Sequence, residues 1–314
     1  MRLIRPFRRL LDDCERRLSE VVAGHAVCLS TPAADTLAAG GKRLRPLLVF
    51  CAAPDPAARR DALVSAASAV ELVHMATLVH DDIIDGASLR RGRPTIADAQ
   101  GPAVAAQVGD FLFARAFAEL TETGDPEAVR ELAEAALALS QGELLQQQAA
   151  FDIHLTEDAY LARCRCKTAS LFAVACRLGA RVGGGDPITV DRVGAFGEHV
   201  GMAFQIFDDI LDLTGDPEAT GKRRGTDLRD GTVTLPVIYA MRDDPSLAAR
   251  VAGVPHGEDV DALCRSVAGT PAMAEARERA LSFVRSAREA LEGLQGVAVA
   301  ALSTIADGVV DRYS

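Results

Sequence analysis

The chain contains no tryptophan, and aromatic residues make up only 4% of its 314 residues. Its core must be built mainly from Ala, Leu and Val, which suits helix packing better than a sheet sandwich. An excess of positive charge is also absent, because 34 basic residues stand against 44 acidic residues and the net charge is −10. This balance argues against a general nucleic-acid-binding protein, which needs a basic surface for the phosphate backbone.

Long apolar runs and cysteine pairs with metal-binding or redox spacing are missing as well. The longest uninterrupted apolar runs, such as residues 47–53, fall far short of the roughly 20 residues that span a membrane. The seven cysteines are an odd number and include no CxxC pair. We therefore expect reduced, mostly buried thiols, no transmembrane segment and a cytoplasmic protein.

Apolar residues recur with helical spacing along almost the whole chain. The pattern predicts helices over residues 61–85, 103–122, 126–150, 156–181 and 187–214, and shorter helices between 235 and 312. Asp125 is the expected N-cap of a helix that starts at Pro126. Convincing strand alternation and long linkers are not found, so the simplest architecture is one all-α domain over residues 1–314.

Two of the predicted helices carry carboxylates where a core helix should be apolar. Residues 81–85 read DDIID and residues 208–212 read DDILD, each between large apolar residues. The first and last Asp of each segment are four positions apart, so they share one helix face and repel each other. Burying them is costly unless a cation compensates. Carboxylate oxygens in this arrangement suit Mg²⁺ together with waters and phosphate oxygens.

Cationic residues accompany both acidic segments. Any one of them alone is consistent with a solvated side chain, and even Lys167 in its apolar stretch could simply extend toward water. Together with two acidic segments they describe a site for two polyanions and their metal ions. The cations are Lys42, Arg45, Arg90, Arg91, Lys167 and Lys222.

These motifs, in this order, resemble those of the trans-polyprenyl diphosphate synthase family, which elongates isoprenoid chains. The resemblance covers nearly the whole chain and implies a single-domain helical bundle of the isoprenoid synthase type around a deep central cavity. The motifs that carry it are GGKRLRP from residue 40, ELVHMATLVHDDIIDGASLRRGRPT from 71, GDFLFARAF from 109, KTASLF from 167, FQIFDDILD from 204 and GKRRGTDL from 221.

The resemblance implies roles for the acidic residues. The ligands of three Mg²⁺ ions that bridge an allylic diphosphate are expected to be Asp81, Asp85, Asp208 and Asp212. Asp82 and Asp209 would support these ligands or bind through water. The catalytic residues implied in this way are Asp81, Asp85, Lys167 and Asp208.

The resemblance also assigns substrate-binding positions. Those that match the binding of isopentenyl diphosphate are Lys42, Arg45, His74 and Arg91. Those that match the surroundings of the allylic substrate are Arg90, Lys167, Thr168, Gln205 and Lys222. One departure concerns a lysine that the family often carries where this chain has Thr232, and Arg223, Arg224 or Arg229 could compensate for it.

The implied reaction is a trans-prenyl transfer, in which an allylic diphosphate ionises with the help of Mg²⁺ and isopentenyl diphosphate attacks the cation. Product length should depend on the helix before Asp81. Ala76 lies about 7.5 Å along the helix axis from Asp81. Ala76 and Thr77 are both small, which predicts an open tunnel and a medium- or long-chain product. Phenylalanines of the 109–117 motif could still close it.

Several alternatives stay open at this point. A synthase that stops at geranylgeranyl diphosphate has the same motifs. A class I terpene cyclase also ionises allylic diphosphates, but it has no need of the GGKRLRP cations. A regulatory subunit of a heteromeric synthase is disfavoured by the two intact acidic segments, and a helical metal-binding module leaves the cations unexplained. The family resemblance further suggests a homodimer.

Overall fold

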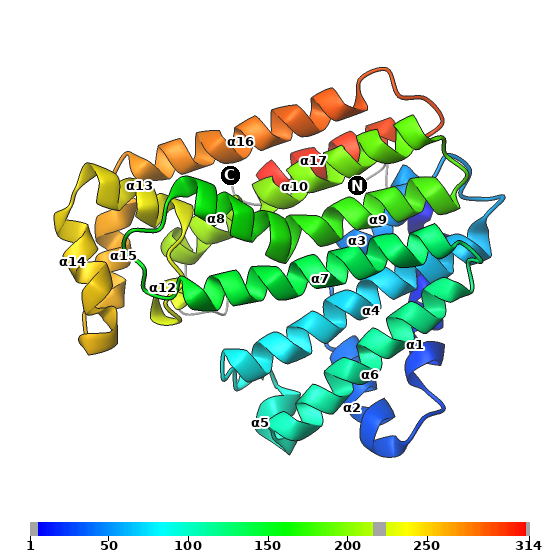
Figure 1. Cartoon of the computed structure of the whole chain (residues 1–314), viewed down its shortest axis with the longest axis horizontal. Helices are drawn as coiled ribbons and strands as arrows, with labels where there is room; N and C mark the ends of the chain where they lie inside the picture. The colour runs from blue at the N-terminus through cyan, green and yellow to red at the C-terminus, as the bar shows by residue number, and fades with distance from the viewer. Residues whose placement is uncertain (1–5, 216–223, 312–314) are drawn as a thin grey trace. The chain divides into compact units, whose positions relative to one another are not determined.

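The computed structural model describes residues 6–215 and 224–311, and nearly all regular structure in them is helical (Figure 1). The all-α prediction is therefore confirmed. The elements are α1 (Arg8–Val22), α2 (Val27–Ala38), α3 (Leu44–Ala52), α4 (Arg60–Ile84), β1 (Leu89–Arg90), β2 (Arg93–Pro94), α5 (Ile96–Gln100), α6 (Pro102–Thr121), α7 (Pro126–Gln148), α8 (Glu157–Cys164), the π-helix η2 (Arg165–Ala169), α9 (Ser170–Val182), α10 (Pro187–Thr214), α12 (Thr226–Arg229), α13 (Leu235–Asp243), α14 (Ser246–Gly253), the 3₁₀-helix η3 (Val254–His256), α15 (Val260–Ala268), α16 (Ala272–Leu291) and α17 (Val299–Asp311).

Four long helices lie within two residues of their predicted bounds, namely α4, α6, α7 and α10. The predicted Asp125 cap is also present. The Asp125 carboxylate accepts hydrogen bonds from the backbone N–H groups of Glu127 (3.0 Å) and Ala128 (3.3 Å), which begins α7. The Thr156 hydroxyl accepts from the N–H of Ala159 at 3.2 Å and begins α8 in the same way.

The sequence reading was wrong in three details. The predicted helix 156–181 consists of α8, η2 and α9, because five residues form a π-helix between two α-helices. The segment after α4 contains an antiparallel hairpin in which Leu89 pairs with Pro94 and Arg90 with Arg93. Two-residue strands are too short to show alternation. Finally, α16 has 20 residues and is not a short helix.

The chain divides into two compact units. Unit 1 comprises the chain up to Ala136, Leu171–Gly197 and Ala290–Thr304. Unit 2 comprises Leu137–Ser170, Glu198–Glu289 and the chain from Ile305 onward. Both units are discontinuous in sequence, and α7, α10 and α17 each contribute residues to both. A single domain over residues 1–314 stays a prediction.

Helix α4 forms the core of unit 1 and contacts α1, α3 and α6. Its small residues, such as Ala66 and Ala69, are fully buried. Helix α6 approaches α4 closely at Gly109, where a Cβ atom would lie 2.2 Å from Nε2 of His80. By length and composition α4 could cross a membrane, but 78% of its most apolar window is buried inside the protein. A buried core helix passes the same test, and we read α4 as one.

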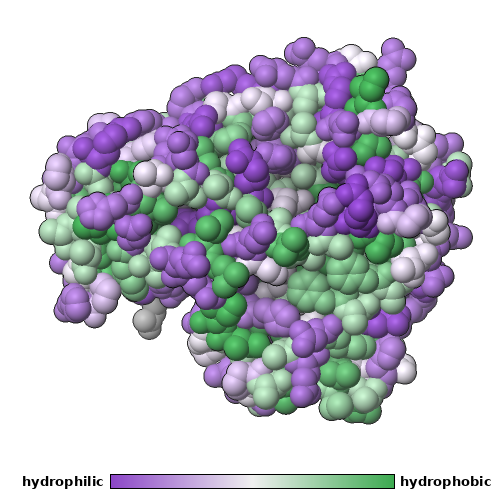
Figure 2. Space-filling model, in the orientation of Figure 1, coloured by the Kyte–Doolittle hydropathy of each residue, from purple (hydrophilic) through white to green (hydrophobic). Residues whose placement is uncertain are grey.

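The surface on the face shown in Figure 2 is a mixture of hydrophilic residues with smaller hydrophobic areas. Large exposed apolar side chains include Leu137, Leu144 and Leu145 of α7. All seven cysteines, each of which the structure describes, are free of disulfides. Five of them are buried, while Cys28 is exposed and Cys166 is half-buried, so the prediction of mostly buried thiols is confirmed.

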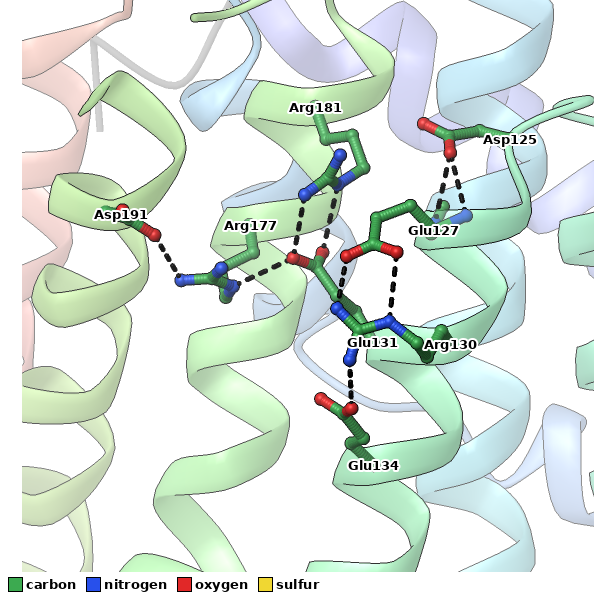
Figure 3. Close-up of polar contacts among 9 residues, drawn as sticks. Asp125, Glu127, Arg130, Glu131, Glu134, Arg177, Arg181 and Asp191 are labelled. Carbon is green, nitrogen blue, oxygen red and sulfur yellow. Dashed lines mark hydrogen bonds and ion pairs between the residues drawn. The ribbon is translucent and has the colours of Figure 1, made fainter. Parts of the chain in front are cut away.

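A buried carboxylate holds three helices of unit 1 together (Figure 3). Glu131 of α7 accepts hydrogen bonds from Arg177 and Arg181 of α9 at 3.1 to 3.3 Å. Arg177 continues to Asp191 of α10 at 3.0 Å. On the exposed side of α7, Arg130 pairs with carboxylates one turn away on either side. Because Glu131 is buried, removing its arginine partners would leave an uncompensated carboxylate in the protein interior and would lower stability.

The core of unit 2 surrounds α8, which contacts η2 and α13. Tyr160 and Phe207 are fully buried there. Arg163 of α8 is also buried, and it donates a 2.8 Å hydrogen bond to the backbone carbonyl of Val233. The segment before α13 is thereby attached to α8.

Candidate active site

The GGKRLRP segment forms a turn that ends at α3, and Arg43 takes a left-handed backbone conformation there with φ of 48°. The Arg43 guanidinium donates to Glu71 of α4 at 2.8 Å and to the carbonyl of Leu37 at 3.3 Å, and it also pairs with Glu15 of α1. Arg43 is therefore occupied by acceptors from three helices. Its neighbour Lys42 is exposed.

Arg45 lies in a desolvated position in the first turn of α3. Its guanidinium carbon is 4.8 Å from the centre of the Phe172 ring. Its Nε is buried and has no hydrogen-bond partner among the residues that the structure describes. Burial lowers the pKa of Arg45 to about 10, although Glu71 opposes this shift. A half-buried guanidinium whose buried Nε has no acceptor among the described residues is suited to bind an anionic oxygen.

His74 lies in the same cationic environment. Burial lowers the pKa of His74 well below its usual value, and the positive charges of Arg45 and Arg91 lower it further. The imidazole is therefore neutral at pH 7 in this structure. Of the four residues predicted to bind isopentenyl diphosphate, Arg45 and Arg91 lie near enough to His74 for their charges to act on its pKa.

The β1–β2 hairpin brings two arginines to this cluster. Arg91 has a φ of 53° and sits at the hairpin turn. A Cβ atom on Gly41 would lie 3.3 Å from Nη1 of Arg91. The hairpin and the GGKRLRP turn are therefore in contact. Arg90 points back to α4, where its Nε donates to Asp82 at 2.7 Å.

The first acidic segment ends α4. Asp82 is buried and paired with Arg90, and burial raises its pKa while Arg90 opposes the shift. Asp81 is half-buried, and Asp85 is exposed at the C-terminal end of the helix. Asp82 therefore supports the helix end, and Asp81 and Asp85 occupy the more solvent-accessible positions. The roles of Asp81 and Asp85 as metal ligands and of Asp82 as their support stay predictions.

The second acidic segment, in unit 2, has a buried central carboxylate as well. Asp209 accepts hydrogen bonds from the hydroxyl of Tyr160 at 2.6 Å and from Nε2 of Gln205 at 2.7 Å. The side-chain oxygen Oε1 of Gln205 accepts a hydrogen bond from the hydroxyl of Thr168 at 2.6 Å. Burial raises the pKa of Asp209 to about 7, and the charge of Asp208 adds to the effect. Thr168 and Gln205 are thus connected to Asp209.

Asp212 closes the segment and interacts with the chain that follows it. Its two carboxylate oxygens accept backbone hydrogen bonds from Thr226 at 3.1 Å and Asp227 at 3.2 Å. Because these N–H groups begin α12, Asp212 fixes the start of that short helix. Asp208 is half-buried one turn earlier on α10.

Lys167 lies in η2, and its Nζ pairs with the carboxylate of Glu143 on α7. The π-helix approaches α7 so closely that a Cβ atom on Gly142 would lie 2.5 Å from the backbone nitrogen of Lys167. Single π-turns inside helices are frequent at functional sites. Lys167 and Thr168 are consecutive residues of this turn.

Two expectations concern the segment after α10. Lys222 and Arg223 lie outside the described residues. Arg224 donates to the carbonyl of Gly215 at 3.4 Å, and Arg229 pairs with Asp261 at 3.0 Å. Arg229 is therefore engaged by a carboxylate, and the compensation for Thr232 stays a prediction.

The donor set fits divalent cations in chemical type. Within residues 6–215 and 224–311, no group of three or more His, Cys, Asp or Glu side chains is arranged to hold a metal ion. Each acidic segment offers its first and last carboxylate at positions that are not fully buried. Pairs of hard oxygen donors of this kind suit a metal ion whose remaining ligands are waters and phosphate oxygens.

The region predicted to set product length lies between α4 and α6. Ala76 is fully buried, and the hydroxyl of Thr77 is bonded to the carbonyl of His74 at 2.8 Å. On α6, the Phe113 ring stacks on His80 with 5.8 Å between ring centres. Phe113 is thus held by a residue next to Asp81.

Sequence reasoning missed three partners of the predicted residues. They are Glu71, Glu143 and Tyr160. Glu71 could have been noticed, because it is a carboxylate in an otherwise apolar helix, one turn before His74. Glu143 and Tyr160 gave no such signal, since their partners are far away in the sequence.

Comparisons with known proteins agree with this description. The sequence model of the polyprenyl synthetase family matches residues 27–263. Heptaprenyl diphosphate synthase component 2 of Geobacillus stearothermophilus is 39% identical over 94% of this chain and 93% of its own length. Nonaprenyl diphosphate synthase of Mycobacterium tuberculosis is 36% identical over 88% of this chain and 84% of its own length.

A solved structure resembles the whole chain. It is the polyprenyl synthase from Caulobacter crescentus CB15 complexed with calcium and isoprenyl diphosphate, with a TM-score of 0.91, 35% identity, and coverage of 100% of this chain and 98% of that one. The fold is therefore the all-α isoprenoid synthase fold. The chain belongs to the polyprenyl synthetase family and is a prenyl-transferring enzyme.

Proposed function

We propose that the protein condenses isopentenyl diphosphate with an allylic prenyl diphosphate and releases a medium- or long-chain polyprenyl diphosphate. One observation carries the proposal. The same chain holds a cluster of cations around the half-buried Arg45 and two acidic segments in each of which the second Asp is buried and hydrogen-bonded. A cyclase of one allylic diphosphate has no need of the cation cluster. The relatives are named as synthases of hepta- and nonaprenyl diphosphates.

The residues would divide the work between the two diphosphates. Isopentenyl diphosphate would be held by Lys42, Arg45, His74 and Arg91. The allylic diphosphate would be held by Arg90, Lys167, Thr168, Gln205 and Lys222. Positive charge placed where negative charge grows on the leaving diphosphate favours cleavage of the carbon–oxygen bond. The double bond of isopentenyl diphosphate then attacks the allylic cation, and the resulting cation transfers a proton to the released diphosphate.

Divalent metal ions would be held by Asp81, Asp85, Asp208 and Asp212. When bound, three Mg²⁺ ions would neutralise the oxygens of the allylic diphosphate. Asp82 and Asp209 act differently, because both are buried and already hydrogen-bonded by Arg90 and Tyr160. They would hold the helix ends in place.

Product length would depend on the space beside Ala76 and Thr77. Both are small, and Ala76 is buried in the core of unit 1, so a growing apolar chain would extend along α4 beyond the first acidic segment. We therefore propose a product longer than geranylgeranyl diphosphate. A synthase that stops at that length is the second candidate.

We further propose a cytoplasmic homodimer. Three leucines of α7, Leu137, Leu144 and Leu145, are exposed, and apolar side chains are unfavourable in contact with water. Their exposure supports an interface in which a second chain covers this part of α7. One relative is named heptaprenyl diphosphate synthase component 2, which indicates an enzyme of two different subunits. A heteromeric enzyme is therefore the alternative to a homodimer. Light scattering of the purified protein distinguishes a dimer from a monomer that needs a second component.

The test of the function is an assay of purified protein with labelled isopentenyl diphosphate, Mg²⁺ and geranyl, farnesyl or geranylgeranyl diphosphate, followed by sizing of the lipids. We expect products of more than four isoprene units, and none when EDTA replaces Mg²⁺. Hydrocarbon made from an allylic diphosphate alone would instead indicate a cyclase. A dimeric, folded protein that incorporates no label with any starter would refute the proposal.

A further inference from the structure

Glu71 is a carboxylate in the middle of α4, the buried core helix of unit 1. It is only 4% exposed, and its neighbours Val70 and Leu72 are completely buried. Burying a carboxylate in such surroundings is strongly unfavourable unless it is paired. Its partner is Arg43, whose Nη1 donates to Oε1 of Glu71 at 2.8 Å.

Arg43 is in turn held in a conformation that needs support. Its φ of 48° is uncommon for a residue other than glycine and carries a conformational cost. Its side chain is only 10% exposed and is bonded to α1, α2 and α4 through Glu15, the carbonyl of Leu37 and Glu71. These bonds fix the backbone of the turn between Lys42 and Arg45.

The position of Arg43 also bears on the cations that surround it. A Cβ atom on Gly41 would be 3.0 Å from Nη1 of Arg43 and 3.3 Å from Nη1 of Arg91. The guanidinium groups of Arg43 and Arg91 therefore border the same glycine. Glu71 acts on Arg45 as well. Burial lowers the pKa of Arg45, and the negative charge of Glu71 opposes this shift and stabilises the protonated guanidinium.

From these contacts we propose that Glu71 is a positioning residue for the isopentenyl diphosphate site. Through Arg43 it fixes the turn that presents Lys42 and Arg45, and its charge offsets the cation cluster while no diphosphate is bound. Four of the five N–H donors of Arg43 are used by Glu71, Glu15 and the carbonyl of Leu37, so we assign Arg43 to positioning the turn and not to binding the diphosphate. The inference rests on the proposed function of this site.

The first experiment compares Glu71→Leu with Glu71→Gln. The leucine removes the acceptor of Arg43, whereas the glutamine keeps an oxygen at the same place. For Glu71→Leu we expect the KM for isopentenyl diphosphate to rise about tenfold or more, with kcat and the KM for the allylic diphosphate changed less than about threefold. Glu71→Gln should restore the KM for isopentenyl diphosphate to within about threefold of the wild type.

The matched control is Glu119→Leu. Glu119 of α6 is a buried carboxylate of the same unit, and it pairs with Arg17 of α1 through two hydrogen bonds of 2.7 and 3.0 Å. This variant should lose thermal stability as Glu71→Leu does, but its KM for isopentenyl diphosphate should stay at the wild-type value. If both variants raise that KM equally, Glu71 is only structural and the proposal is wrong.

Binding is measured separately from turnover. Calorimetric titration of the EDTA-treated protein with isopentenyl diphosphate should show binding to the wild type and a loss of about tenfold or more in affinity in Glu71→Leu. If Glu71→Leu does not fold, Arg43→Lys replaces it, because lysine keeps the charge but loses the planar fork, and the same loss of affinity is expected.

Equal affinity of the wild type and the variant for isopentenyl diphosphate would refute the positioning role of Glu71 and would leave the proposed function unaffected. Absence of binding to the wild type, together with absence of elongation, would instead refute the proposed function.

Discussion

Tyr160 donates a 2.6 Å hydrogen bond through its phenol oxygen to Oδ2 of Asp209, and both side chains are buried. The phenol keeps its proton, because burial and the charge of Asp209 raise the pKa of Tyr160 well above 10. A residue of α8 thus supports the middle of the acidic segment of α10.

Tyr160→Phe should destabilise the protein by about 1–3 kcal/mol, because the buried carboxyl group of Asp209 would lose one of its two donors and keep only Gln205. Urea unfolding measures the effect. The control is Tyr239→Phe, since the hydroxyl of Tyr239 donates to Glu157 at 2.9 Å and Glu157 is about one third exposed. The control should cost less than about 1 kcal/mol. Equal losses in both variants would contradict a special role of Asp209.

Asp81→Ala should leave the fold intact and abolish product formation. Asp81 is only half-buried at the last turn of α4, so its truncation opens no large cavity in the core. Circular dichroism and thermal unfolding check the fold, and the labelled-lipid assay checks turnover. Near-normal turnover in a folded Asp81→Ala protein would exclude the proposed metal role of this carboxylate.

The pH dependence of stability should include a contribution from His74. Its pKa is lowered by burial and by Arg45, Arg91, Arg90 and Arg43, while Glu71 is the buried carboxylate one turn before it on α4. Below pH 6.5 the unfolded chain binds a proton at this position and the folded chain does not. Stability must therefore fall as the pH decreases from 6.5 toward the lowered pKa.

His74→Gln should remove this contribution. Between pH 6.5 and 5.5 we expect the variant to lose about 1 kcal/mol less of its free energy of unfolding than the wild type. Urea titrations at the two pH values provide the comparison. Identical pH dependence in the two proteins would show that His74 is not held in its neutral form.

The sequence allowed most helices to be placed, and it failed where a structure depends on contacts between distant residues. α4 and α10 were predictable because their apolar periodicity is long and their ends are marked by Gly, Pro or capping residues. The π-turn at Lys167 was not, since it arises where η2 meets α7 at Gly142. A glycine in the middle of a predicted helix was its one visible sign.

In the candidate site, too, local patterns were predictable from the sequence and contacts between distant residues were not. Residues of one motif, such as Arg90 and Asp82, are close in sequence and were assigned to one site. Their distant partners were not, because nothing local marks Tyr160 as the donor to Asp209 or Glu143 as the partner of Lys167. The sequence therefore predicted which residue types carry the chemistry, and the structure was needed to find what positions them.

Glu131→Gln should test the ion cluster of Figure 3. Its buried carboxylate is shared by Arg177 and Arg181, so neutralising it should cost about 1–3 kcal/mol of stability. Glu134→Gln is the control, because Glu134 is exposed and pairs with Arg130 only one turn away, and it should cost less than about 0.5 kcal/mol. A larger effect of the control in thermal or urea unfolding would contradict the importance of burial here.

Ala76→Phe should shorten the product. Ala76 is fully buried on α4, about 7.5 Å along the axis from Asp81, and a phenyl ring there would fill the space into which the lipid is proposed to grow. Ala69→Phe is the matched comparison. Ala69 is also fully buried, lies seven positions earlier on the same helix face, and is about 10.5 Å further from Asp81 than Ala76 is.

If the product extends along α4, Ala76→Phe should give the shortest chains, Ala69→Phe intermediate chains and the wild type the longest. Overpacking should cost each variant about 1–3 kcal/mol, so thermal unfolding must show that both remain folded at the assay temperature. Sizing of the labelled lipids gives the order directly. Chains from Ala76→Phe as long as those of the wild type would show that the lipid takes another route, since a ring at this depth could not leave such a path open.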